Sequence, residues 1–117
     1  MPYLLLIHEP VGQRQQRGTE EGQAVYDRML RFADSLQRRG VLKAAESLSS
    51  LDKSARITVR EGKARVLDGP FAEAKEMVGG FFLVDVPTRE QALELARECP
   101  AAAWATVEVR ETGPCYL

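Results

Sequence analysis

His8 is the residue of this chain best suited to acid–base chemistry. It is the only histidine, and imidazole is the side chain whose unperturbed pKa lies near neutrality. A neighbouring carboxylate would orient the ring and raise its basicity, and Asp68 or Glu46 can supply one. The simpler interpretation is a strand-end histidine that makes a structural hydrogen bond or lies in solvent, because no sequence spacing brings His8 to Asp68. His8 and Asp68 are the candidate catalytic residues.

A turn at residues 68–76 offers a second group of reactive side chains. Asp68 can accept hydrogen bonds from backbone N–H groups of the turn, and Gly69 has a permissive backbone that the following Pro70 restricts. The segment brings a carboxylate, an aromatic ring and a Lys–Glu pair to one edge of the predicted sheet. The alternative is a rigid crossover in which Phe71 fills the core. The expected ligand-binding residues are Glu46, Gly69, Pro70, Phe71 and Lys75.

Glu46 and Trp104 give less specific signals. Glu46 interrupts an apolar stretch, so its carboxylate could bind a ligand or bridge to Lys75; the alternative is a side chain that faces outward from a strand. Trp104 could line a ligand site together with Phe71, although aromatic side chains in a chain of this size belong more often to the core.

Other kinds of site are not indicated. Cys99 and Cys115 form no CxxC pair, and a structural zinc site needs about four soft ligands, so we expect no metal. The Gly79-Gly80 pair has neither a following helix nor Walker spacing, so it predicts close strand packing or a bulge and no phosphate loop. We expect no cofactor.

The elements that must position these residues follow the order β-α-β, hairpin, β-α-β. This order predicts an α+β fold, a ferredoxin-like antiparallel sheet with two helices on one face and an inserted β-hairpin. Thr19 is the expected cap of the first helix and Gly40 its end, while Thr88 and Gln91 form a capping-box pattern before the second. The expected helices span 19–39 and 88–99, and the expected strands 2–7, 41–48, 55–60, 63–67, 81–86 and 104–111.

Two of these strands are apolar on both faces. Residues 2–7 and 81–84 offer apolar side chains in both parities, whereas helices can cover only one face of the sheet. An exposed apolar patch of that kind usually marks a partner surface, and the simplest partner is a second copy packed sheet against sheet. We therefore expect a homodimer. The alternative is a monomer in which the hairpin folds over that face.

Length and charge restrict the class of protein. The chain has 117 residues, which fits one domain over 1–117, and a net charge of -1 with a pI of about 5.9. This balance lacks the basic footprint of a nucleic-acid-binding protein. No segment approaches the roughly 20 apolar residues of a membrane span, and the N-terminus lacks the pattern of a signal peptide. We expect a cytoplasmic protein without nucleic-acid or membrane partners.

The segment Asp68-Gly69-Pro70-Phe71 and its continuation to Glu76 closely resembles the motif that names the DGPF family, within the wider YCII-related group. The resemblance covers residues 2–110 and implies a dimeric α+β-barrel. Many members resemble products encoded beside extracytoplasmic-function sigma factors, while some relatives look like small enzymes, including a dehydrochlorinase, with a His–Asp pair in a pocket at the dimer cleft. The resemblance also rests on 3–7, 40–42, 46–48, 79–86, 92–100 and 107–110.

The chain departs from those enzymes at one position. Their proposed catalytic histidine lies in the first helix, about eleven residues before the glycine that ends it, and counting back from Gly40 gives Met29. The acid–base pair of the relatives therefore cannot be transferred to this chain. We expect a protein that binds a small-molecule ligand at the dimer cleft, with catalysis unproven. The alternative is a non-catalytic regulatory module that acts with an extracytoplasmic-function sigma factor.

Overall fold

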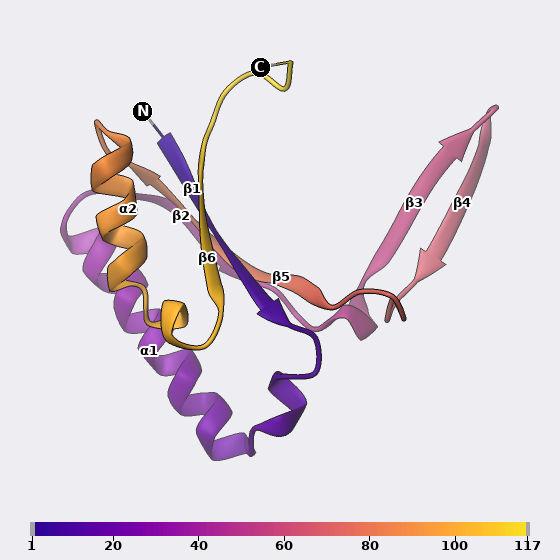
Figure 1. The fold of residues 1–117 in the computed structure, drawn as a ribbon, viewed down its shortest axis with the longest axis horizontal. Coiled ribbons are helices and arrows are strands. Elements are labelled where there is room, and N and C mark those ends of the chain that lie inside the picture. The colour runs from indigo at the N-terminus through magenta and orange to yellow at the C-terminus, as the bar shows by residue number, and fades with distance from the viewer. Residues whose placement is uncertain (1, 117) are drawn as a thin grey trace.

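Alternating apolar residues build a four-stranded antiparallel sheet from segments that lie far apart in the sequence. The computed structural model describes residues 2–116. The sheet has the strand order β2-β5-β1-β6, and each neighbouring pair is antiparallel. Its strands are β1 (Pro2–Pro10), β2 (Leu42–Ser47), β5 (Glu76–Asp85) and β6 (Thr106–Glu111) (Figure 1). This order confirms the predicted α+β, ferredoxin-like fold.

Two helices connect these strands and pack on one side of the sheet. Helix α1 (Thr19–Arg38) joins β1 to β2, and helix α2 (Arg89–Glu98) joins β5 to β6 (Figure 1). Short 3-10 turns are η1 (Arg14–Gln16), η2 (Leu51–Lys53) and η3 (Pro100–Ala103). Within residues 2–116, neither helix combines the length and the apolar character that a membrane span requires.

The helix ends follow the sequence signals, with one exception. Thr88 and Gln91 form the predicted capping box: the Thr88 hydroxyl accepts the Gln91 N–H, and the Gln91 side chain accepts the Thr88 N–H. Gly40 has a φ of 74° and ends α1, as its left-handed conformation requires. Thr19 was wrong as the cap of α1, because Gly18 occupies that position and Thr19 begins the helix.

The core lies between the helices and one face of the sheet. Tyr3, Leu5 and Ile7 alternate along β1 as buried residues, and α1 packs Phe32 and Leu36 against them. The residues between them on β1 are only half-buried, and they belong to the opposite face, which no helix covers. We call this second surface the open face. Its side chains include Leu4, Leu6 and His8 of β1 and Phe81 and Leu83 of β5.

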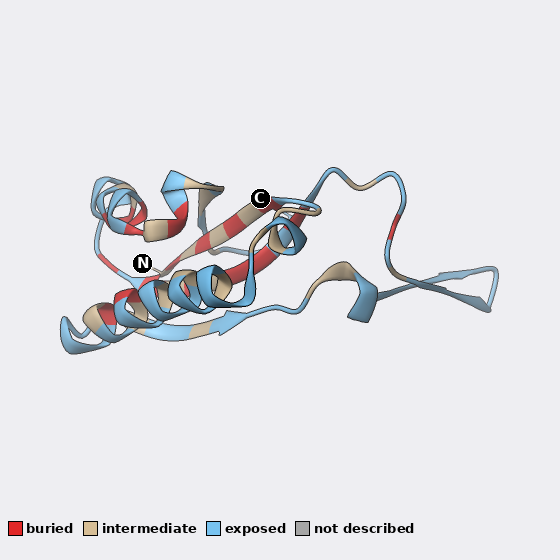
Figure 2. Cartoon of the chain, turned by 90° about the horizontal axis from the view of Figure 1, so that it is seen from below, coloured by how far each residue is buried: buried red, intermediate tan, exposed pale blue. Residues whose placement is uncertain are grey.

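The predicted hairpin forms a separate two-stranded sheet that projects from the body. It consists of β3 (Ala55–Arg60) and β4 (Lys63–Asp68), and every residue of both strands is exposed (Figure 2). Glu61 and Gly62 have φ values of 53° and 77°, the left-handed geometry of a tight hairpin turn. The hairpin points away from the sheet, so in this single chain it does not fold over the open face.

We expect Leu36→Ala to lower the free energy of unfolding by about 2–5 kcal/mol, because it removes a side chain with no exposed surface and leaves a cavity. Urea denaturation of the purified protein measures the change. The control is Gln37→Ala at the exposed neighbouring position, which should shift stability by less than about 0.5 kcal/mol. Equal losses in both variants would contradict this position of α1 against the sheet.

Candidate functional site

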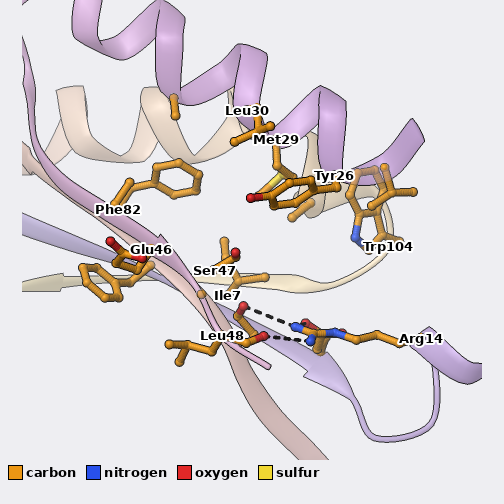
Figure 3. Close-up of a pocket in the computed structure, with 18 of the residues that line it drawn as sticks. Ile7, Arg14, Tyr26, Met29, Leu30, Glu46, Ser47, Leu48, Phe82 and Trp104 are labelled. Atoms are coloured by element: carbon orange, nitrogen blue, oxygen red, sulfur yellow. Dashed lines mark hydrogen bonds and ion pairs between the residues drawn. The ribbon is translucent and has the colours of Figure 1, made fainter. Parts of the chain in front are cut away.

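A cavity of about 430 Å³ lies between residues 22–33 of α1 and the helix-covered face of the sheet (Figure 3). The C-terminal half of α1 packs tightly through Phe32 and Leu36, whereas Met29 and Val25, about one and two turns before Phe32, are only half-buried. Gly80 pairs with Ile7 and lies on the same face of β5 as the buried Phe82 and Val84, two and four residues later. Gly80 therefore belongs to the helix-covered face but places no side chain there. The floor of the cavity is therefore backbone at this point.

An ion pair between Glu9 and Arg14 forms one wall of the cavity. Glu9 is 7% exposed, and both of its carboxylate oxygens accept hydrogen bonds from Arg14, at 2.8 and 3.0 Å. The Arg14 guanidinium also donates to the carbonyl oxygens of Leu48 and Gly79. Because a buried carboxylate must be paired and hydrogen-bonded, this bidentate contact stabilises Glu9. Together with the two carbonyl contacts it ties η1 to β1, to β5 and to the segment that follows β2.

Gly79 provides the room for this carboxylate. The β1–β5 register pairs Ile7 with Gly80 and His8 with Val78, so Gly79 is the extra residue of a bulge, as the glycine pair indicated. A Cβ atom at Gly79 would collide with the Oε1 atom of Glu9. Any larger residue would therefore displace Glu9 from Arg14 and alter the wall of the cavity.

Tyr26 and Trp104 place polar groups at the cavity. Figure 3 shows the Tyr26 hydroxyl pointing into the space beside Met29, and the indole nitrogen of Trp104 facing the same space. Neither group makes a hydrogen bond to a side chain or carbonyl of residues 2–116. The Trp104 ring is flanked by Arg28, whose guanidinium carbon lies 4.8 Å from the ring centroid. The sequence left open whether Trp104 belongs to the core or lines a ligand site; in the structure Trp104 lines the cavity and also packs against the core.

Glu46 is the one predicted ligand-binding residue that borders this cavity. It lies on β2, the edge strand, and its register partner is Phe81, which belongs to the open face. Its neighbours Ala45 and Ser47 pair with residues of the helix-covered face, so the Glu46 side chain leaves β2 on the other side. Glu46 is exposed and therefore lies at the margin of the cavity rather than inside it.

The segment from Asp68 to Lys75 lies elsewhere, at the base of the hairpin. The Gly69 N–H donates to the Ser54 carbonyl at 2.7 Å, and a Cβ atom at Gly69 would collide with the Leu51 carbonyl oxygen. The peptide bond between Gly69 and Pro70 is cis. Gly69 thus lets the backbone approach η2 closely, which is a structural role.

Phe71 completes this anchor. It is buried, and the Arg56 guanidinium carbon lies 3.7 Å from the centroid of its ring, so the pair joins the base of β3 to the turn. Phe71 is not part of the main core, so the alternative of a core-filling crossover holds only in part. Asp68 and Lys75 are exposed, and none of the residues from Asp68 to Lys75 lines the cavity.

His8 has a carboxylate partner that the sequence did not suggest. Its Nε2 atom lies 2.6 Å from Oε1 of Glu108, and the other oxygen of Glu108 accepts two hydrogen bonds from Arg110, at 2.8 and 2.6 Å. Because a carboxylate only accepts, Nε2 is the donor. The β1–β6 register places Glu108 opposite Leu6, so this His8–Glu108–Arg110 cluster lies on the open face, away from the cavity. His8 does not pair with Asp68 or Glu46.

Met29 lines the cavity. It stands at the position of α1 that corresponds, by the sequence resemblance, to the proposed catalytic histidine of the related enzymes. The titratable residues at the cavity are Glu9, which Arg14 neutralises, marginal Glu46, and Tyr26. No nucleophile with an adjacent base faces the cavity within residues 2–116. The same residues contain no cluster of three His, Cys, Asp or Glu side chains that could hold a metal ion. The geometry suits binding more than acid–base catalysis.

We expect Gly69→Ala to destabilise the fold by about 1–3 kcal/mol, because the added methyl group collides with backbone that cannot rotate away. Thermal or urea unfolding measures the loss. Gly113→Ala is the matched control, since nothing lies within 4 Å of a Cβ atom there. A Gly69→Ala protein as stable as the control would show that the close approach to Leu51 is not needed.

The pKa of Glu108 is lowered, first by hydrogen bonds from Arg110 and then by the bond with His8. A lowered carboxyl pKa contributes stability that is complete above the ordinary pKa and is lost as the pH falls through the lowered one. We expect Arg110→Gln to raise the Glu108 pKa more than His8→Gln does. NMR titration of the Glu108 carboxyl group in both variants measures the two pKa values. A larger rise in His8→Gln would contradict the conclusion that Arg110 lowers this pKa more than His8 does.

The sequence comparisons agree with this architecture. The family model of the YCII-related domain matches residues 1–114. A similar protein from Rhizobium meliloti (strain 1021), itself described as uncharacterised, is 34% identical over 76 residues. The match covers 62% of this chain and 61% of the relative, so the chain spans less than two thirds of the relative's length. The chain belongs to the YCII-related domain family.

Proposed function

We propose that this protein binds a small, largely apolar molecule in the cavity beneath α1. The observation that supports the proposal is the cavity itself: its volume of about 430 Å³ falls within the range of roughly 300–1,000 Å³ typical of ligand pockets. Its lining is mainly apolar, with Val25, Met29, Leu30 and Phe82 facing the space. A few polar groups at its margin would fix the orientation of the ligand.

The polar groups favour a neutral ligand with a hydrogen-bond acceptor. The indole nitrogen of Trp104 only donates, and the Tyr26 hydroxyl can donate or accept. Arg14 is occupied by Glu9 and two carbonyl oxygens, so it offers an anionic ligand little unused charge. Glu46 at the margin would repel an anion. An aromatic or aliphatic compound with a carbonyl or hydroxyl oxygen fits these groups best.

Our proposal is binding without catalysis in this cavity. The position that would carry the relatives' histidine is Met29, a thioether that neither accepts nor releases a proton. His8, the one imidazole, is held by Glu108 on the open face. A regulatory module acting with an extracytoplasmic-function sigma factor remains the alternative, and it does not require the cavity to be filled.

We also propose that two chains pair through their open faces. Leu4, Leu6, Phe81 and Leu83 form an apolar strip across the two central strands, and no helix covers it. A two-fold axis would bring two such strips together and bury both. The ligand cavity lies on the other face of the sheet, so the pairing leaves its lining unchanged.

A fragment screen by ligand-observed NMR, using neutral aromatic carbonyl compounds and alcohols, tests the binding proposal. We expect Met29→Trp to weaken the best hit at least tenfold, because the larger ring fills the cavity. Tenfold corresponds to about 1.4 kcal/mol of binding free energy. Arg31→Trp, on the exposed side of the same helix, is the control and should leave affinity unchanged.

Two results would count against this site. Equal affinity in Met29→Trp and Arg31→Trp would place the ligand outside the cavity. Weaker binding in a folded Asp68→Ala protein would move the site to the turn at the base of the hairpin. If no compound binds while the protein stays folded, the regulatory alternative becomes the better interpretation.

A further inference from the structure

The β3–β4 hairpin has one apolar face that nothing in its own chain covers. We call residues 55–68 the arm. Ile57 lies opposite Val66, and Val59 lies opposite Ala64, so these four side chains share a face. Ile57, Val59 and Val66 are 66%, 58% and 61% exposed. Three β-branched side chains are therefore gathered on one surface and left in solvent.

A hairpin of this kind is not stable on its own. A two-stranded hairpin alone is marginally stable in water, and it needs a third strand or a packed surface to become independent. The arm pairs only within itself, and its strands form a sheet separate from the main one. The Gly69 and Phe71 contacts fix its base but leave the apolar face bare. The arm thus needs a surface outside its own chain.

The rim of the cavity is a second uncovered apolar surface. Tyr26 and Leu30 on α1 are 50% and 48% exposed, and Leu48 beyond β2 is 41% exposed. All three line the cavity, and we call them the rim. The arm of the same chain projects away from α1 and cannot cover it (Figures 1 and 2).

We propose that the arm of one chain packs its apolar face on the rim of a second copy. Each chain carries one arm and one rim, so a two-fold pair satisfies both surfaces reciprocally. The contact itself needs no ligand. Its consequence, that a partner closes the mouth of the binding cavity, rests on the proposed function.

Charge supports a second copy as the occupant. The face of the arm opposite the apolar one carries Arg56, Arg60, Lys63 and Arg65. The arm holds four of the chain's 16 basic residues and two of its 17 acidic ones, so the rest of the chain has an excess of three acidic residues. Exposed Asp27 on α1 lies beside exposed Arg28 and Arg31, so the acidic excess belongs to the body as a whole and not to the rim alone. A basic arm therefore meets an acidic body, which favours the encounter.

Site-directed cross-linking tests this contact. One chain carries Val59→Cys and a differently tagged chain carries Leu30→Cys, both with Cys115→Ser so that the exposed native thiol is removed. The two are co-expressed and oxidised. We expect a disulfide between the two tags. Thr58→Cys, on the basic face of the same strand, is the control and should link to Leu30→Cys at least fivefold less.

The readout separates this contact from the proposed open-face pairing and from ligand binding. Cross-links that join Val59→Cys to Val59→Cys and not to Leu30→Cys would overturn the proposal in favour of an arm-to-arm contact. Absence of any cross-link in an assembled protein would also overturn it. If the expected cross-link forms but no compound enters the cavity, the arm contact stands and the proposed function fails.

A second measurement uses charge instead of thiols. Ile57→Lys with Val66→Lys should raise the dissociation constant of self-association at least tenfold by sedimentation analysis, while Thr58→Lys leaves it within twofold. Circular dichroism confirms that each variant remains folded. Equal effects of the two substitution sets would contradict an apolar contact.

Discussion

Two helices cover one face of a four-stranded sheet and leave the other bare, and the remaining features of the chain follow from this imbalance. Strands β1 and β5 carry apolar side chains on both faces, so the sheet has a second surface that a single chain cannot bury. The insertion between β2 and β5 does not compensate, because the hairpin projects away from the sheet. The chain has more apolar surface than its own elements can bury.

The cavity arises from a second local constraint, the glycine bulge on β5. Gly79 gives the Glu9 carboxylate its space, and Gly80 lets the β5 backbone approach β2, where an added Cβ atom would lie 2.9 Å from the Glu46 carbonyl oxygen. The pairing of Glu9 with Arg14 then fixes η1 and the entry to α1. A buried carboxylate without that guanidinium would be strongly unfavourable. The shape of the cavity and the stability of this end of the sheet therefore depend on the same contacts.

Local signals predicted most of the fold. Gly40, the Thr88–Gln91 capping box and the Glu61-Gly62 turn each act within a few residues, so their spacing is sufficient. The contacts of the candidate site residues were harder to predict, because they join residues that lie far apart in the sequence. His8 meets Glu108 only through the β1–β6 register, which no short spacing reveals. Glu108 and Arg110 alternate with valines along β6 and therefore share a face, but this pattern alone does not identify the residue of β1 that they contact.

The most distinctive motif of the sequence lies where the backbone has the least room, and this does not make it a binding site. Position 69 must be glycine because a Cβ atom there would collide with the Leu51 carbonyl oxygen, and Phe71 packs against Arg56 at the base of the arm. Packing therefore explains both residues. The cavity is lined instead by residue types that are common in any core, such as Met29 and Trp104. Sequence cannot separate a core methionine from a lining one, because the difference is the distance at which α1 stands from Gly80. The motif therefore identifies the architecture and the direction of the arm, while the capacity to bind depends on a gap between two elements that only the folded chain creates.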